Sequence, residues 1–299
     1  MSTGSTALTV PDLSRRRTAR GARNALATAA ICLSVAIVLV PLVLVIATVV
    51  RKGASSISWA FFTDDIPPGR RIGPGMGPAV VGTIVTTGIA AALAVPLGIL
   101  AAIYLHEYGR SGRLPAVIRF LADVMTGVPS IVMGLFVSAI WVVRFGIDGV
   151  TGFAGALALG CLMLPIVIRS TEEMLKLVPD ELRQASFALG GGQARTILTV
   201  VLPSAFPGIL SGVLLSIARA AGETAPLLFT IGAATKTNWD AFKGPNTALS
   251  LQIFANAQQP FAGAQQRAWG AALTLIGLTF LLLILARVFA ALVQRTQRP

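Results

Sequence analysis

The stretch ALATAAICLSVAIVLVPLVLVIATVV, residues 25–50, contains no charged side chain. A bilayer core about 30 Å thick is crossed by roughly 20 apolar helical residues, so this stretch is long enough to span a membrane. A secretory signal has an apolar segment of only about 7–15 residues, and no clear small-residue cleavage motif stands before Arg51. Residues 25–50 therefore predict a retained transmembrane helix, and the polar, basic residues 1–24 predict a disordered cytoplasmic tail.

The composition of the whole chain agrees with a membrane protein. Of its 299 residues, 55% are hydrophobic and only 12% are charged, whereas a soluble domain averages about 25% charged residues. Five further apolar runs are long enough to be spans: 79–104, 120–143, 150–168, 205–229 and 269–293. We therefore predict an all-α integral membrane protein with six transmembrane helices: the span at 25–50, an external loop at 51–78, a transmembrane domain at 79–293 and a tail at 294–299. A second external segment follows the fifth run, with a short helix around 248–258.

The chain carries 24 Lys and Arg residues and a net charge of +12. Most of these cations lie between the apolar runs, and they lack the interleaved aromatic side chains of a single-strand nucleic-acid surface, so membrane topology explains them better. With the N-terminus inside, the cytoplasmic segments hold about twice as many Lys and Arg residues as the external ones, as the positive-inside rule expects. We expect both termini in the cytoplasm.

The segment between the fourth and fifth apolar runs, VPDELRQASFALG at residues 178–190, has the pattern of a short helix. Pro179 suits a first helical position, Asp180 and Glu181 suit the positive end of a helix dipole, and Gly190 suits a helix stop. The segment predicts an amphipathic cytoplasmic helix at 179–190. From these residues alone, an ordinary helix lying on the membrane surface is the favoured interpretation.

This loop resembles the one that bacterial ABC importer permeases carry, which reads Glu-Ala-Ala, three residues, Gly, nine residues, Ile, any residue, Leu-Pro. Here 184–186 (Gln-Ala-Ser) take the first three places, Gly190 takes the place of the Gly, and 200–203 (Val-Val-Leu-Pro) complete the spacing. Gln and Ser depart from the family's Glu and Ala. In that family this coupling helix docks on an ATP-binding subunit, so the resemblance implies that contact for Glu181, Gln184, Ala185 and Gly190.

No phosphate-binding loop of the form Gly-x-x-x-x-Gly-Lys-[Ser/Thr] occurs in the sequence, so any ATP must be used by a partner. Cys32 and Cys161 both lie inside apolar runs, and a single histidine, His106, makes no metal site with them. We expect a transport subunit rather than an enzyme, without catalytic residues, cofactor or metal of its own, and with ATP and Mg²⁺ bound by the partner subunit.

Arg219 lies deep in the fifth apolar run, and Glu223 follows one helical turn later. A charge at the bilayer centre costs about 2.5–3.5 kcal/mol on translocon scales, so such side chains usually face a bundle interior or an aqueous cavity. At positions i and i+4 the two side chains can pair. They form either a structural ion pair or a cationic site on an anion pathway, since a guanidinium matches the oxygens of phosphate.

Three further residues are candidates for the same pathway. Arg169 ends the fourth run, where it either reaches back to the interface or lies near an inner gate. Ser130 follows a Gly and a Pro that interrupt the third run, and Thr224 follows Glu223. Arg119 and Asp123 lie four residues apart, and we interpret them mainly as a structural pair.

The stretch RAAGETAPLLF, residues 219–229, resembles the signature of phosphate importer permeases, and its TAPLLF end is similar to their PstA-type subunit rather than the PstC-type partner. Residues 72–83, 96–109, 126–132 and 164–173 agree with this resemblance. It implies a core of five spans with the first helix outside it, in a bacterial plasma membrane. It also implies four kinds of partner: membrane lipid, a homologous PstC-type permease, two ATP-binding subunits and an extracytoplasmic phosphate-binding protein.

Three alternatives remain open at this point. The first is a permease of the same family for another oxyanion or small solute. The second is an ATP-independent channel or secondary transporter, which would need no coupling helix. The third is a membrane scaffold, in which Arg219 and Glu223 would serve packing alone.

Overall fold

The computed structural model describes residues 17–68, 71, 73–109 and 112–296. The expectations for Ile72, for residues 1–16 of the N-terminal tail and for residues 297–299 lie outside this part of the chain. Within it, six helices are long and apolar enough to cross a membrane: Gly21–Ser56, Gly77–Tyr108, Ser130–Gly149, Gly152–Lys176, Gln193–Gly222 and Ala262–Leu285. The prediction of an all-α protein with six spans is confirmed.

The chain divides into two compact units, residues 1–51 and 52–299. In the first unit, α1 (Arg17–Gly53) is one long helix with Pro41 inside it. Its side chains are apolar all round from residue 25 to residue 50, the pattern of a helix whose surroundings are apolar on every side. The predicted first span lies within this helix.

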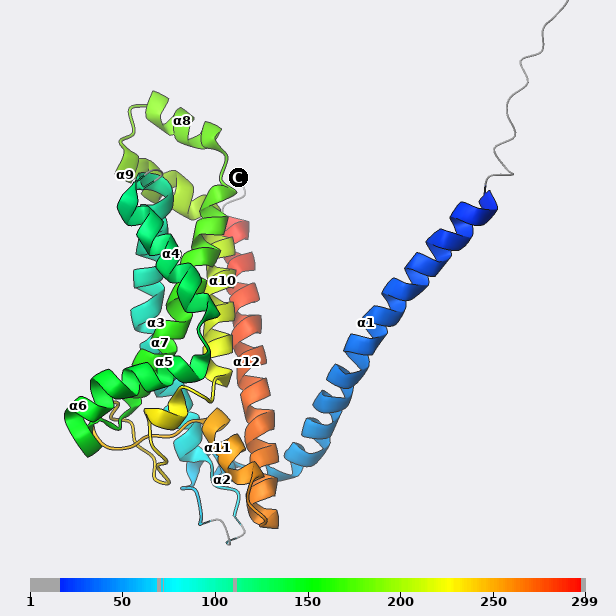
Figure 1. Cartoon of the computed structure of the whole chain (residues 1–299), viewed down its shortest axis with the longest axis vertical. Helices are drawn as coiled ribbons and strands as arrows, with labels where there is room; N and C mark the ends of the chain where they lie inside the picture. The colour runs from blue at the N-terminus through cyan, green and yellow to red at the C-terminus, as the bar shows by residue number, and fades with distance from the viewer. Residues whose placement is uncertain (1–16, 69–70, 72, 110–111, 297–299) are drawn as a thin grey trace, which may run out of the picture. The chain divides into compact units, whose positions relative to one another are not determined.

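The second unit is a bundle of four long helices: α3 (Gly77–Ile103), α7 (Gly152–Lys176), α10 (Leu202–Gly222) and α12 (Ala262–Thr296). They lie side by side along the bundle (Figure 1). Small residues bring α3 and α7 together, as in many membrane helix pairs. A Cβ atom added to Gly98 would stand 2.7 Å from Cγ1 of Val167.

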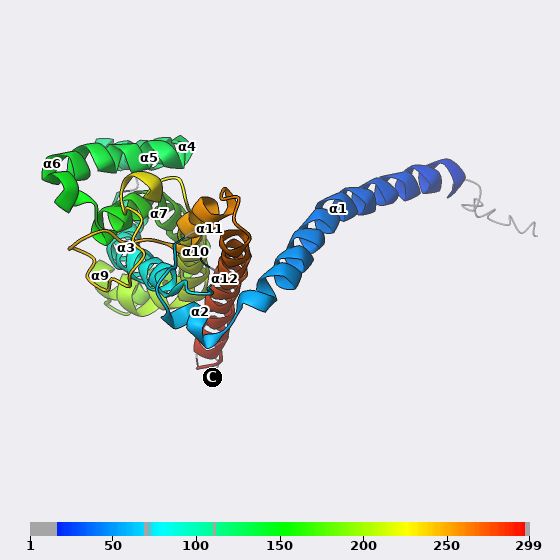
Figure 2. The same ribbon diagram turned by 90° about the horizontal axis from the view of Figure 1, so that it is seen from below.

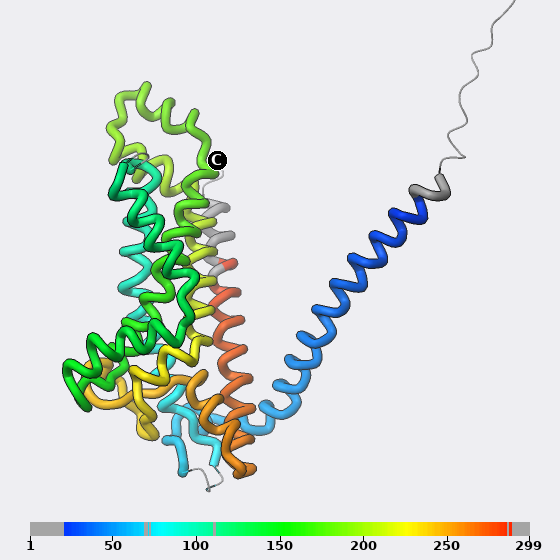
Figure 3. Tube along the Cα trace, in the orientation of Figure 1, coloured from blue at the N-terminus to red at the C-terminus, as the bar shows by residue number. Residues whose placement is uncertain are grey.

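The third apolar run is not one straight helix. It is divided into α4 (Arg113–Gly127) and α5 (Ser130–Val137), which η4 (Ser138–Val142) and α6 (Val143–Phe145) continue. Val128 and Pro129 between them are extended, with ψ angles of 130° and 137°, since a proline pushes the preceding residue out of the helical region. The chain turns sharply here (Figure 3), and α4, α5 and α6 form a row along one side of the bundle (Figure 2). The prediction of a span at 120–143 is therefore wrong, and Ser130–Gly149 is the apolar helix.

The fifth span also differs from its prediction of 205–229. It begins earlier, because α9 (Gln193–Thr196) and η6 (Ile197–Val201) lead without a break into α10, and it ends at Gly222. Glu223 has a ψ angle of 132°, and a short turn, η7 (Leu227–Phe229), follows Pro226. A glycine followed by a nearby proline weakens the helix at this point.

Short helices lie at the two ends of the bundle (Figure 1). One end carries α8 (Asp180–Ala188), which occupies the predicted segment 179–190. The opposite end carries η2 (Ala54–Ser56), α2 (Trp59–Thr63) and α11 (Leu249–Ala257). The first two lie in the predicted external loop, and α11 lies at the short helix expected around 248–258.

Candidate functional site

The two interrupted helices create a cavity at mid-height of the bundle. The segment that joins α4 to α5, the middle of α7 and the end of α10 surround a space of about 310 Å³. Pro129 and Pro165 stand on two sides of it, and a proline has no N–H group to donate to the helical hydrogen-bond ladder. Irregular backbone at membrane depth is tolerated where it is buried in protein or lines a water-filled space. The lining residues are Met125, Thr126, Val128, Pro129, Ser130, Leu162, Pro165, Ile166, Arg219 and Glu223.

The predicted contact between Arg219 and Glu223 is present at the wall of this cavity. Nε of Arg219 lies 3.6 Å from Oε1 of Glu223, and the side chains are 71% and 19% exposed. Glu223 is not inside a helix as expected, because α10 ends one residue earlier. Ser250 of α11 fixes this end, since its hydroxyl donates to the backbone carbonyl of Glu223 at 2.8 Å. The pair is loose, so most of the guanidinium donors remain free.

Of the other three pathway candidates, only one lines the cavity. Ser130, the first residue of α5, lines the cavity. Thr224 is not among the lining residues, and its backbone carbonyl accepts from the amides of Leu227 and Leu228 in the turn after α10. Arg169 also lies outside the cavity lining, so the pathway role expected for it and for Thr224 stays a prediction without support from this geometry.

Arg169 belongs to a charged cluster between α4 and α7. It pairs with Asp123 and lies 3.7 Å from Glu172. Arg119 also turns to Glu172, with Nε 3.0 Å from Oε1, and donates to the carbonyl of Leu105. The expected pair of Arg119 with Asp123 is therefore wrong. The reason is that Glu172 is buried and needs a cation more than the exposed Asp123 does.

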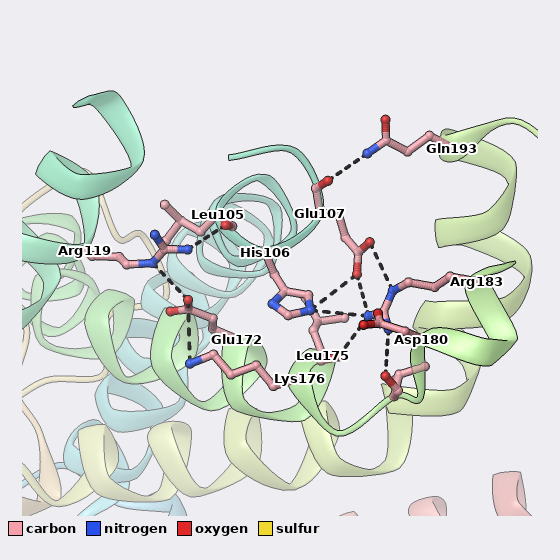
Figure 4. Close-up of polar contacts among 11 residues, drawn as sticks. Leu105, His106, Glu107, Arg119, Glu172, Leu175, Lys176, Asp180, Arg183 and Gln193 are labelled. Carbon is pink, nitrogen blue, oxygen red and sulfur yellow. Dashed lines mark hydrogen bonds and ion pairs between the residues drawn. The ribbon is translucent and has the colours of Figure 1, made fainter. Parts of the chain in front are cut away.

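A second charged cluster fixes α8 to the bundle (Figure 4). Arg183, on the inner face of α8, is 5% exposed, and its Nη2 lies 2.8 Å from Oε1 of Glu107 in η3 (Tyr104–Tyr108), the π-helical end of α3. The same guanidinium donates to two backbone carbonyls at the end of α7. The carbonyl of Leu175, in the last turn of the helix, lies 3.1 Å away, and that of Val178, just beyond the helix, lies 2.7 Å away. From α9, the Gln193 amide donates to the carbonyl of Glu107 at 2.7 Å.

Sequence reasoning counted Arg183 only as one more cytoplasmic cation and gave Glu107 no role. The only local signal was Asp180, three residues before Arg183 on the same short helix, with which Arg183 also pairs at 3.2 Å. Because Glu107 lies far from Arg183 in sequence, only the fold brings the two together.

The outer face of α8 is exposed. Glu181, Gln184, Ala185 and Gly190 are all exposed, and so is Leu189, at 90%. Gly190 has a φ angle of +82°, a conformation that glycine adopts without strain, and it ends the helix. A hollow of about 400 Å³ adjoins this face, lined by Leu182, Ala185, Ser186, Leu189, Gly191, Arg195, Thr199 and Val200. Apolar exposure beside a hollow is typical of a surface for a partner protein.

Among the described residues, no three His, Cys, Asp or Glu side chains come together as metal ligands. The expectation that this chain holds no metal or cofactor remains a prediction.

The chain is similar to known membrane transport proteins. Residues 94–298 match the family described as "Binding-protein-dependent transport system inner membrane component". "Phosphate transport system permease protein PstA 1" of Mycobacterium tuberculosis (strain H37Rv) is 46% identical over 261 residues, which are 86% of this chain and 84% of that protein. The PstA protein of Yersinia pestis is 44% identical over 84% of each chain.

Solved structures show the same fold at low sequence identity. The MetNI methionine ABC transporter, in an inward-facing conformation, contains a chain that matches with a TM-score of 0.56 and 18% identity, covering 72% of this chain and 93% of that one. At this identity the likeness speaks for the fold alone.

Proposed function

Since this chain belongs to the family of binding-protein-dependent transport system inner membrane components, we propose that it is the permease subunit of an ATP-driven importer of inorganic phosphate. The observation that carries the proposal is the set of relatives named as PstA phosphate permeases, which are up to 46% identical over 86% of the chain. The protein is a multi-pass membrane protein and a transport subunit rather than an enzyme. It works with partner subunits, as its family does.

Phosphate passes beside Arg219 in this proposal. The guanidinium offers several N–H donors in one plane, which match the oxygens of a tetrahedral anion. Glu223 holds the guanidinium through the 3.6 Å contact and accepts a hydrogen bond from a protonated oxygen of phosphate. Sulfate has no such proton at neutral pH and would meet the carboxylate with like charge, so the pair selects phosphate over sulfate.

The exposure of Arg219 supports a pathway shared with a second permease subunit. A cation that is 71% exposed at membrane depth is costly unless another protein or a water-filled space covers it. We infer that a homologous PstC-type subunit supplies the other half of the pathway. An extracytoplasmic phosphate-binding protein delivers phosphate at the end that carries α2 and α11.

The opposite end faces the cytoplasm in this proposal, and α8 is the coupling helix. Two ATP-binding subunits, which hold the ATP and Mg²⁺, dock on the permease pair, and the exposed Glu181, Gln184, Ala185 and Gly190 lie at this chain's contact. Arg183 and Glu107 then carry the motion of α8 into α3 and α7. The C-terminal end of α12 lies at the same end as α8 (Figure 1), which supports a cytoplasmic C-terminus in a bacterial plasma membrane.

The test is uptake of radioactive phosphate into vesicles that contain the full complex, with and without ATP. We expect ATP-dependent uptake that excess unlabelled phosphate abolishes and excess sulfate leaves unchanged. Arg219→Gln should abolish uptake while the complex still assembles, and Arg144→Gln, an exposed position of α6 outside the cavity lining, serves as the matched control. Uptake that needs no ATP would point to a channel or secondary transporter, and competition by sulfate would point to another oxyanion as the cargo.

A further inference from the structure

A second polar cavity lies at the end of the bundle that carries α2, far from the cavity at Arg219. It has a volume of about 250 Å³, far more than the roughly 10–15 Å³ that one water molecule requires. Its walls come from η2, the loop before α3 and the first turns of α12. The lining residues in the described part of the chain are Ser55, Ser56, Ser58, Gly73, Pro74, Gly263, Gln266 and Arg267, and none of these is acidic.

Arg267 is the unusual member of this wall. Its side chain is only 2% exposed, which makes it the largest of the fully buried side chains in the described part of the chain. Nη1 donates to the carbonyls of Arg71 and Gly73 at 3.0 and 3.3 Å. Nε is buried without a hydrogen-bond partner, and no described carboxylate pairs with the guanidinium.

A buried cation without a counter-charge is costly, since the desolvation of a guanidinium is offset only by a close anion or a full set of hydrogen bonds. Two carbonyl groups satisfy one end of this guanidinium. Nε belongs to the edge with which arginine binds carboxylate or phosphate through two parallel hydrogen bonds, and Nε has no hydrogen-bond partner among the described residues.

The local packing holds this arrangement in place. The hydroxyl of Ser56 donates to the carbonyl of Gln266 at 3.1 Å and so ties η2 to α12. A Cβ atom at Gly270 would come within 2.9 Å of Cβ of Ser56, so the two elements approach as closely as a glycine allows. Nζ of Lys52 lies over the Trp269 ring, 4.7 Å from its centroid, which adds a second positive charge at this end of α12.

From these observations we propose that this cavity binds a small oxyanion of the phosphate class, held by the guanidinium of Arg267 and by the serine hydroxyls of the wall. Anion binding here does not depend on the cargo proposed above, whereas the placement of the cavity on the outer side rests on that proposed function. There the site would hold an anion next to the outer mouth of the permease, apart from the pathway beside Arg219.

The test uses chemical modification of the full complex, with no need for transport. Ser55, an exposed residue of the wall, is replaced in Ser55→Cys, in a chain that also carries Cys32→Ala and Cys161→Ala. The rates of reaction with an anionic and a cationic thiosulfonate reagent are compared. Gln258→Cys, exposed at the same end but outside the cavity, is the matched control.

We expect the anionic reagent to react severalfold faster than the cationic one at the Ser55 position, with a ratio near one at the Gln258 position. Inorganic phosphate at ten times its half-protecting concentration should slow the reaction in the Ser55→Cys chain by about an order of magnitude, as single-site occupancy requires. Sodium chloride at equal ionic strength should not. Adding Arg267→Gln should remove both the preference for the anionic reagent and the protection.

Two results would overturn the proposal: equal rates for the two reagents in the Ser55→Cys chain, or no protection by phosphate beyond that of chloride. If Arg267→Gln prevents assembly, the measurements on the Ser55→Cys chain with Arg267 intact still decide the question. A failure here would leave ATP-dependent phosphate uptake untouched, and a failure of uptake would leave this binding measurement valid.

Discussion

The contact between Arg183 and Glu107 makes the sharpest prediction about how α8 is held. Replacing Arg183 with Met removes the cation and leaves the carboxylate of Glu107, which is only 6% exposed, without its partner. Breaking a buried ion pair from one side costs about 3–5 kcal/mol. The carbonyls of Leu175 and Val178 also lose their donor, which places the expected loss in the upper part of that range.

This loss destabilises the packing of α8 against the bundle rather than the whole fold, because α8 can detach while the long helices stay packed. Local opening of this kind is measured by amide hydrogen exchange. Since 1.4 kcal/mol is a tenfold change in an equilibrium constant, a loss of about 4–5 kcal/mol should lower exchange protection in α8 roughly 700- to 4,000-fold in Arg183→Met. Protection in the middle of α3, α7 and α10 should change little.

Two further variants separate the ion pair from a general disturbance of the loop. In Arg183→Met with Glu107→Met, no buried carboxylate is left without its cation, and the remaining Asp180 is exposed to solvent, so most of the lost protection should return. Arg195→Met removes an exposed cation from the same loop and should stay within about 0.5 kcal/mol of the parent chain. The reasoning is refuted if Arg183→Met leaves exchange in α8 unchanged, or if the double variant is as poorly protected as the single one.

Three other predictions follow from single positions. Gly98→Ala should destabilise the bundle by about 1–3 kcal/mol in thermal unfolding, since the new Cβ meets Val167 at 2.7 Å, whereas Gly88→Ala on the same helix meets nothing and should be neutral. Gly190→Ala forces a φ angle of +82° on alanine and should cost about 1 kcal/mol in exchange protection at the end of α8, with ATP-driven uptake reduced more than ATP hydrolysis. Glu223→Gln should let sulfate compete with phosphate uptake, and continued exclusion of sulfate would remove Glu223 from selectivity.

The sequence predicts the membrane class and the number of spans because both depend on local composition, as residues 25–50 illustrate. It fails where the backbone at membrane depth departs from a helix. The run at 120–143 is apolar throughout its middle, so hydropathy alone cannot distinguish one span from two segments that meet at Val128 and Pro129. The sequence also predicts a helical Glu223, because hydropathy says nothing about the backbone conformation after Gly222.

Charge partners were the least predictable feature. Local spacing favoured Arg119 with Asp123 and Arg219 with Glu223, and the structure keeps only the second pair. Spacing along one helix captures neighbours on a surface, where an ion pair contributes little. The closer ion pairs here form at buried carboxylates. Glu172 and Glu107 are buried because elements distant in sequence pack around them.

The distribution of these pairs distinguishes the α8 end of the bundle from the rest of it. Near α8, the enclosed Arg183 has a close carboxylate partner at 2.8 Å, as does the partly exposed Arg119 at 3.0 Å. Arg219 has only a loose contact at 3.6 Å, and Arg267 has no described carboxylate partner. Tight, buried pairs suit an end that must transmit force without yielding, whereas cations with unused donors suit the places where a mobile anion supplies the missing charge. In both proposals the same residue type serves rigid coupling at the α8 end and anion binding elsewhere, and the difference lies in whether the fold brings a carboxylate close to the arginine.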